Sequence, residues 1–150
     1  MSVAGGTNTF FPNMGYAGGT GTVYWNQMGS GFQTLTTSGD PASHGTSSPY
    51  NYGQVGVPGG EVVTNTVTDP ADEANGVRYR CLGWSVTNAA GAVIGTASNT
   101  QAVFTMSTNL FLKWFWTNEF HLTTTWRPGG SVQPDQTGWY TNGIVRPFSA

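Results

Sequence analysis

Few side chains in this sequence can carry acid–base or nucleophilic chemistry. The chain has two histidines, His44 and His121, and one cysteine, Cys81. Glu119 and His121 are two residues apart, so they share a face of an extended strand and could pair there, although an exposed polar face explains the spacing equally well. No motif of a serine hydrolase, a zinc protease or a Cys–His nucleophile accompanies them. We therefore expect no catalytic residue and no enzymatic activity.

Oxygen ligands gather in one predicted loop, residues 69–76. The loop supplies carboxylate and amide oxygens of the kind that calcium binds, from Asp69, Asp72, Glu73 and Asn75. Their spacing is not that of an EF-hand, and Asp-Pro followed by Asn-Gly is ordinary turn chemistry. We predict no metal site and no cofactor.

The only lysine and the only cysteine both fall in predicted strands. Lys113 lies between Phe111 and Phe115 on one strand face. An isopeptide bond from Lys113 to an asparagine is one interpretation, but a lysine stem that covers aromatic surface is favoured. Cys81 stands in the run GVRYRCLGW, which favours a buried, unreactive thiol, and a single cysteine excludes a disulfide framework.

Aromatic residues make up 13% of the chain, and several fall in predicted loops. These are Tyr50, Tyr52, Trp139 and Tyr140. Exposed aromatic rings can stack on sugar rings, which makes glycans a candidate partner. Tyrosine and tryptophan are also enriched at subunit interfaces, so a contact with a second protein chain is the competing interpretation.

Charged residues are only 8% of the 150 residues, against about 25% in typical soluble domains. With a net charge of −2 the chain has no basic footprint for nucleic acid or anionic lipid. No apolar run approaches the roughly 18 residues of a membrane span, so we expect no membrane insertion. This composition favours an extracellular or cell-surface fibre.

The elements that must position these residues are predicted to be strands. Twenty-two glycines and eight prolines punctuate the chain, and no window has a convincing helical period. The alternating runs predict strands at residues 22–28, 32–37, 61–68, 77–86, 101–106 and 110–127. Residues 38–52 are predicted to be a long polar loop or short edge pieces, and residues 69–76 and 88–100 to be loops. Many short strands with turns between them indicate an all-β fold.

The run at residues 110–127 is too long for one ordinary strand. It alternates strictly, with Trp114 and Trp116 on the apolar face, and it would extend for about 60 Å. A compact domain of this size has a radius of gyration of only about 15 Å. The run therefore either breaks near Thr117 and Asn118 or passes from one folded unit into another, and we favour the second.

An internal repeat supports that choice. The segment from Leu35 to Pro41 (LTTSGDP) matches the segment from Leu122 to Pro128 (LTTTWRP), and Val23-Tyr24-Trp25 before the first echoes residues 113–116 before the second. The repeat divides the chain into an N-terminal donor-like segment (1–31), a complete β unit (32–119) and a partial second unit (120–150). We expect small β-sandwich or grasp-like units, one complete and one incomplete.

The middle unit resembles the divergent InlB B-type repeats of bacterial surface and secreted proteins. The resemblance is carried by GVRYRCLGWS, NTQAVFTMSTN and LKWFWTNEFHL in that order, and by residues 128–143 as the head of a further repeat. It covers about residues 32–145. Residues 40–60 lack the Trp-Tyr pair of that head, and the second unit stops before its own Gly-Trp strand. The resemblance implies a β-rich module used as a stalk or spacer, without catalysis.

Half a β unit cannot bury its apolar face or satisfy its edge strand alone. We therefore expect the partial unit to be completed by the N-terminal segment of a neighbouring copy, through β-strand complementation. Such a head-to-tail contact does not close and generates a homopolymer, a pilus-like filament. The predicted subunit interface consists of Phe10, Phe11, Val23, Tyr24, Trp25, Phe120, Leu122, Trp126, Trp139 and Tyr140.

Three alternatives remain open from the sequence. Both ends could fold back on their own chain and give a monomeric sandwich. The chain could be a carbohydrate-binding β module of a secreted protein. It could also be a phage virion fibre protein, which would account for a start, MSVAGGTNTF, without the basic and apolar regions of a signal peptide.

Overall fold

The computed structural model describes residues 31–125, 128–130 and 136–147. Its elements are all strands, which confirms the all-β prediction: β1 (Phe32–Asp40), β2 (Ser47–Ser48), β3 (Gly53–Pro58), β4 (Val62–Val67), β5 (Ala71–Ala74), β6 (Val77–Asn88), β7 (Val93–Ala97), β8 (Gln101–Thr105), β9 (Leu110–Leu122) and β10 (Gly138–Thr141).

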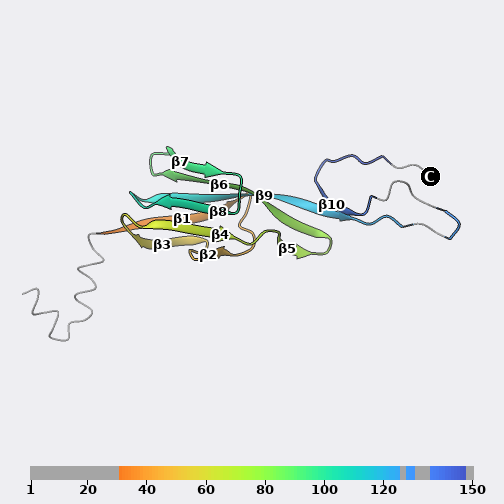
Figure 1. Cartoon of the computed structure of the whole chain (residues 1–150), viewed down its shortest axis with the longest axis horizontal. Coiled ribbons are helices and arrows are strands. Elements are labelled where there is room, and N and C mark those ends of the chain that lie inside the picture. Colours follow the sequence, from red (N-terminus) through yellow and green to blue (C-terminus); the bar gives the residue numbers. More distant parts are fainter. Residues whose placement is uncertain (1–30, 126–127, 131–135, 148–150) are drawn as a thin grey trace, which may run out of the picture.

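Two sheets form a sandwich (Figure 1). The larger sheet has the order β3-β1-β9-β6-β5, with β7 paired to β6 and β10 paired to β9, and the smaller has the order β2-β4-β8. β1 and β9 run parallel, in a register that places Leu35 beside Leu110 and Asp40 beside Phe115. All the other pairs between described strands are antiparallel.

The core follows the alternation of β9. Its four inward side chains, Leu110, Leu112, Trp114 and Trp116, are at most 4% exposed. They belong to one buried cluster with side chains of the second sheet, among them Val63, Ala102, Phe104 and Met106. The predicted burial of the two tryptophans is confirmed, and the core lies between the two sheets.

One polar side chain is also fully buried, Asn65 of β4. Its amide nitrogen donates to Ser47 Oγ at 2.8 Å and to the Tyr50 carbonyl at 3.1 Å. Its side-chain oxygen accepts from the Tyr50 amide at 2.9 Å. Because every polar atom of the buried amide has a partner, Asn65 fastens the connection between β2 and β3 to the second sheet.

Several element boundaries were predicted wrongly. β9 ends at Leu122, β1 continues to Asp40, and the predicted loops at 69–76 and 88–100 contain β5 and β7, whereas β2 is one of the short edge pieces allowed at 38–52. β3 was not predicted at all. Each of β2, β3, β5 and β7 pairs with a single neighbouring strand. Backbone hydrogen bonds along that one edge give the segment its strand conformation, so its sequence need not alternate between apolar and polar residues as that of a strand covered by a second layer does. The predicted strand at residues 22–28 lies outside the described residues.

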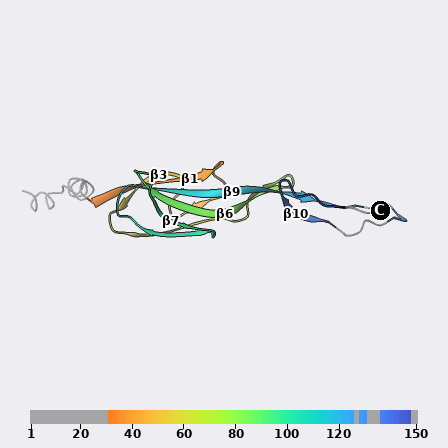
Figure 2. The ribbon, with the colours of Figure 1, turned by 90° about the horizontal axis from the view of Figure 1, so that it is seen from above.

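The end of β9 projects beyond the sandwich (Figures 1 and 2). Its last residues pair with the start of β6 on one edge and with β10 on the other. We call this region the distal arm; it consists of residues 71–80, 117–122 and 138–141. β1 begins at the opposite end of the long axis (Figure 1).

Candidate functional site

The distal arm continues the face of β9 that is buried in the sandwich. Phe120 and Leu122 follow Trp116 at even spacing, so their side chains lie on the same face of the strand. Tyr140 of β10 lies directly opposite Phe120 and shares that face. Trp116 is 4% exposed, whereas Phe120 is 43% exposed. Between these two residues, the side of the sheet that faces the core therefore changes from buried to exposed.

The uncovered face contains an open hollow of about 320 Å³. Its apolar lining is Phe120, Leu122, Tyr140 and Ile144. The Arg146 guanidinium lies 4.5 Å from the Tyr140 ring centroid, and the Tyr140 hydroxyl donates to the Gln136 carbonyl at 2.9 Å. These contacts hold the ring in place, so the hollow has a defined wall.

The opposite face of the arm carries a polar and aromatic cluster. Arg78 Nε donates to Glu119 Oε2 at 2.7 Å, with about a fifth of each side chain exposed. The same guanidinium lies 4.3 Å from the Trp139 ring centroid, and the His121 ring meets that indole edge-on at 5.0 Å. The cluster joins β6, β9 and β10, so it stabilises the arm through contacts that are internal to it.

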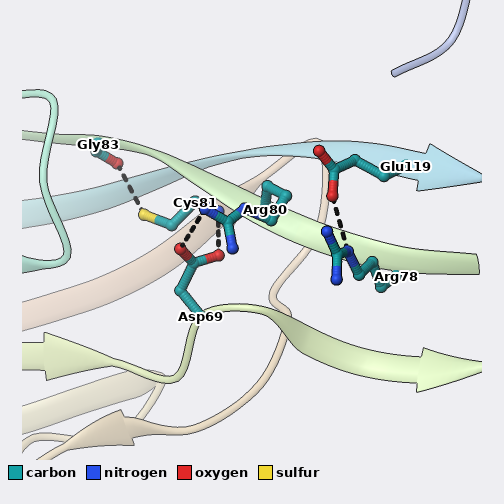
Figure 3. A network of polar contacts seen from close by, with 6 residues as sticks. All are labelled: Asp69, Arg78, Arg80, Cys81, Gly83 and Glu119. Atoms are coloured by element: carbon teal, nitrogen blue, oxygen red, sulfur yellow. Dashed lines mark hydrogen bonds and ion pairs between the residues drawn. The ribbon is translucent and has the colours of Figure 1, made fainter. Parts of the chain in front are cut away.

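A second set of contacts fastens the arm to the sandwich (Figure 3). Asp69 accepts from the Cys81 amide at 2.9 Å and lies 3.5 Å from Arg80 Nη2. The Cys81 thiol donates to the Gly83 carbonyl at 3.6 Å, and burial raises the pKa of this thiol. Cys81 is half-buried and its thiol is held in the protonated form, which is the chemistry of a structural rather than a reactive cysteine.

His44 belongs to this junction. Its ring stacks on Tyr79 of β6, with centroids 3.5 Å apart and planes at 11°, and it meets Trp116 edge-on at 5.8 Å. His44 Nδ1 lies 3.0 Å from Asp72 Oδ2, and the Gly45 amide donates to Asp72 Oδ1. The loop after β1 is therefore clamped to the base of the arm.

The acidic loop does not converge on a metal site. Asp69 faces Cys81 and Arg80, whereas Asp72 faces His44, so the two carboxylates have different partners. Among the residues that the structure describes, no group of three or more His, Cys, Asp or Glu side chains could hold a metal ion.

The other candidate side chains also have partners of their own. Glu119 pairs with Arg78 rather than with His121, whose Nδ1 lies 3.2 Å from Thr123 Oγ1. Lys113 Nζ lies 3.5 Å from Asp40 Oδ2, with both side chains about half exposed.

Four of the predicted interface residues lie on the arm. Phe120, Leu122 and Tyr140 come together on the uncovered face, and Trp139 lies on the opposite face. The other six lie outside the described residues: Phe10, Phe11, Val23, Tyr24, Trp25 and Trp126.

The loop aromatics divide differently. Tyr50 and Tyr52 pack against the core, and their hydroxyls donate to Glu61 and to the His44 carbonyl. Each ring is therefore partly covered by the protein itself.

Sequence reasoning missed Ile144, Arg146 and Arg78. Ile144 and Arg146 stand in a segment without a repeating pattern, and only the turn after β10 brings them to the hollow. Arg78 acquires its role from the β6–β9 register, which places it opposite Glu119. Charge was the one signal available in the sequence. The chain has few ionisable residues, so Arg78 and Glu119, which have opposite charges and lie on two predicted strands, could have been paired.

Comparisons with known proteins give no family assignment: neither a known protein family, nor a curated protein, nor a solved structure matches this chain. In the described part of the chain no helix is long and apolar enough to cross a membrane.

Proposed function

We propose that this chain is a structural subunit of an extracellular, pilus-like filament that assembles head to tail by β-strand complementation. The observation that carries the proposal is the distal arm, a single layer of sheet whose core-facing side presents Phe120, which is 43% exposed, beside the partly buried Leu122 and Tyr140. A sheet in a globular protein normally buries such a face against a second layer. A partner whose apolar side chains covered this face would gain about 25 cal/mol for each Å² of apolar surface buried.

The partner that fits best is the N-terminal segment of a second copy. Thirty residues precede the described part of the chain, and they include Phe10, Phe11, Val23, Tyr24 and Trp25. This segment joins β1 at the end of the molecule that is remote from the arm (Figure 1). A contact between opposite ends of successive copies is heterologous, so it repeats without closing and builds a filament.

Composition agrees with this role. Only 8% of the residues are charged and the net charge is −2, so copies repel one another weakly. The resemblance to stalk-forming InlB B-type repeats favours an extracellular or surface location. Three ion pairs of the arm and its junction, His44–Asp72, Arg78–Glu119 and Arg80–Asp69, are structural contacts, which suits a non-enzymatic building block.

Two assembly-deficient variants test the proposal when they are mixed. Deletion of residues 1–30 removes the donor segment but keeps the arm, whereas Leu122→Asp places a carboxylate on the acceptor face but keeps the donor. Electron microscopy should show filaments for the unmodified chain and none for either variant alone. The two variants mixed should form a 1:1 dimer by light scattering, because one intact donor and one intact acceptor remain.

Val103→Asp is the control, since Val103 is an exposed apolar residue, at 49%, that lies on β8 away from the arm. This variant should still form filaments. Filaments from both the deletion and the Leu122→Asp variant would overturn the proposal, as would an unmodified chain that stays monomeric.

One observation favours a second function, carbohydrate binding. A polar hollow of about 420 Å³ lies at the β5–β6 turn, where Glu73, Asn75, His121 and Trp139 line it. An indole with amide and carboxylate groups around it is the combination that binds a neutral sugar ring. If this is the function, a glycan array should show binding that Trp139→Ala abolishes, and electron microscopy should show single particles.

A further inference from the structure

We infer that the donor segment adds to the arm as a strand parallel to the end of β9, with Val23 of one copy beside Leu122 of the next and Trp25 beside Thr124. This inference rests on the proposed function and specifies its contact. The added strand runs in the same direction as β9 and pairs with the edge of β9 that β6 occupies as far as Phe120.

The pairing at the end of β9 repeats the pairing of β1 in the sandwich. β1 contains Leu35 and pairs antiparallel with β3, which follows it in the chain after the short strand β2. β9 ends at Leu122, and its last residues pair antiparallel with β10, the next described strand along the chain. Leu122 and Leu35 both precede two threonines and are 87 residues apart (122 − 35). The end of β9 therefore occupies the place in the arm that β1 occupies in the sandwich.

β1 has a second, parallel neighbour, β9, and among the described residues no strand takes the equivalent place beside Leu122. Leu110 and Leu112 of β9 lie beside Leu35 and Thr37 in a parallel ladder, and both leucines are fully buried. A shift of 87 residues carries Leu110 onto position 23 and Leu112 onto position 25 (110 − 87 and 112 − 87), which are Val23 and Trp25. The donor segment thus has apolar side chains at the two positions where the parallel neighbour of β1 has buried leucines.

At Leu122, no described strand occupies the edge of β9 that would receive the donor segment. On this edge β6 pairs with β9 only as far as Phe120, opposite Val77, and the His121 amide donates to the Gly76 carbonyl at 2.8 Å. Beyond this bond no described strand lies on that edge beside Leu122. Leu122 is therefore the first position where a new strand fits, as Leu35 is the first residue of β1 in register with β9.

In this register the donor segment comes from another copy, because the N-terminal segment of a chain is too short to bring Val23 to Leu122 of the same chain. The parallel register places Phe32 three residues before the level of Leu110, and Leu122 lies twelve residues beyond that level. At about 3.3 Å per residue these points are roughly 50 Å apart. The nine residues from Phe32 back to Val23 span at most about 32 Å when fully extended. Val23 can reach Leu122 only in a neighbouring molecule.

Disulfide trapping tests the register in assembled filaments. The variant combines Val23→Cys and Leu122→Cys with Cys81→Ser, so that only the two introduced thiols can pair. Cα atoms of adjacent strands are within the separation that a disulfide requires. Mild oxidation should convert the protein into a ladder of covalent multimers on a non-reducing gel, and reduction should return it to monomer.

The matched control is Val23→Cys with Thr124→Cys, also in the Cys81→Ser background. A register shifted by two residues, with Trp25 in the place of Trp114, would bring Val23 beside Thr124. In the inferred register this control should give little or no ladder. A helical reconstruction of unmodified filaments gives the register without any substitution, so the inference stays testable if a double variant fails to assemble.

The outcomes separate the two claims. Filaments with a ladder only in the Val23–Leu122 variant support both. Filaments with a ladder only in the Val23–Thr124 variant, or with neither ladder, overturn the register and leave the filament proposal standing. An unmodified chain that forms no filaments overturns the proposed function and this inference with it.

Discussion

Arg78 Nε and Glu119 Oε2 lie 2.7 Å apart across the β6–β9 ladder, and the same guanidinium stacks on Trp139 of β10. One side chain thus joins three strands of the distal arm. Because four-fifths of both charged side chains is buried, the pair is shielded from solvent more than an ordinary surface ion pair. Within the described residues no second sheet packs on the arm, so we expect this contact to contribute to its rigidity.

The first prediction concerns this pair. Arg78→Met should lower the free energy of unfolding by about 1–3 kcal/mol, because it leaves a partly buried carboxylate without its donor. Hydrogen exchange should accelerate most in β10, where Trp139 loses its guanidinium partner. Lys113→Met is the control, because its 3.5 Å contact with Asp40 is half exposed and should change stability little. Equal effects of the two substitutions in urea unfolding would contradict the prediction.

The second prediction concerns the buried amide of Asn65. Asn65→Ala removes three hydrogen bonds and leaves the Tyr50 amide without its acceptor, so urea unfolding should show a loss of about 2–3 kcal/mol. The neighbouring Thr64→Ala on the exposed face of β4 should stay within about 0.5 kcal/mol. A loss for Asn65→Ala no larger than for Thr64→Ala would show that the amide network is not holding this connection.

The third prediction concerns the bulge in β6. Gly83 has φ +133°, and a Cβ atom there would collide with the Ala97 carbonyl. Gly83→Ala should therefore cost more than about 2 kcal/mol, because both the backbone conformation and the contact with β7 must change. Gly56→Ala in β3 is the control, since its Cβ would meet only Phe32 Cδ1 at 3.5 Å, an ordinary contact. Thermal unfolding of the two variants decides; equal melting temperatures would refute the strain argument.

The fourth prediction concerns alkaline pH. Burial raises the pKa of Tyr52 above its ordinary value of 10.0, so the folded protein holds this proton at a pH where the unfolded chain releases it. The stabilisation is fully present below pH 10 and is lost as the pH rises through the folded-state pKa. Unfolding measured between neutral pH and about pH 11 should show this fall. Tyr52→Phe should lose stability at neutral pH, since its bond to the His44 carbonyl is gone, but should fall less steeply.

The Tyr50 hydroxyl adds to the same alkaline slope. Its hydrogen bond to Glu61 raises the pKa of Tyr50, with burial as a second cause. The double variant Tyr50→Phe with Tyr52→Phe should therefore have a flatter profile than Tyr52→Phe alone. Identical slopes for the unmodified chain and the double variant would contradict both assignments.

The buried strands of the fold could be predicted from the sequence because the alternation of apolar and polar residues along each strand indicates which side chains face the core. Strict alternation from Leu110 onward predicts that Trp114 and Trp116 are buried, and the same alternation places Phe120 and Leu122 on the arm. The edge strand β8 was predicted, but several other edge strands escaped prediction. β3, for example, is rich in glycine and contributes one buried side chain, Val57, so its strand conformation comes from pairing with β1.

The site could be predicted only as far as single strands allow. Trp139 and Tyr140 were predicted together as interface residues. Consecutive side chains of a strand point to opposite faces of the sheet, so only Tyr140 lies on the uncovered face. The contacts of Arg78 and His44 depend on register and on a loop that folds back, so long-range pairing decides them. No local pattern in the sequence encodes that pairing.

The parallel pairing of β1 with β9 has a mechanical consequence. The chain enters the sandwich at Phe32 at one end and leaves it along β9 at the other (Figure 2). Tension between those ends would slide β1 along β9 and load the ladder from Leu35–Leu110 to Asp40–Phe115 in shear. All its hydrogen bonds would then resist together, whereas a hairpin pulled from its open end would break them one after another.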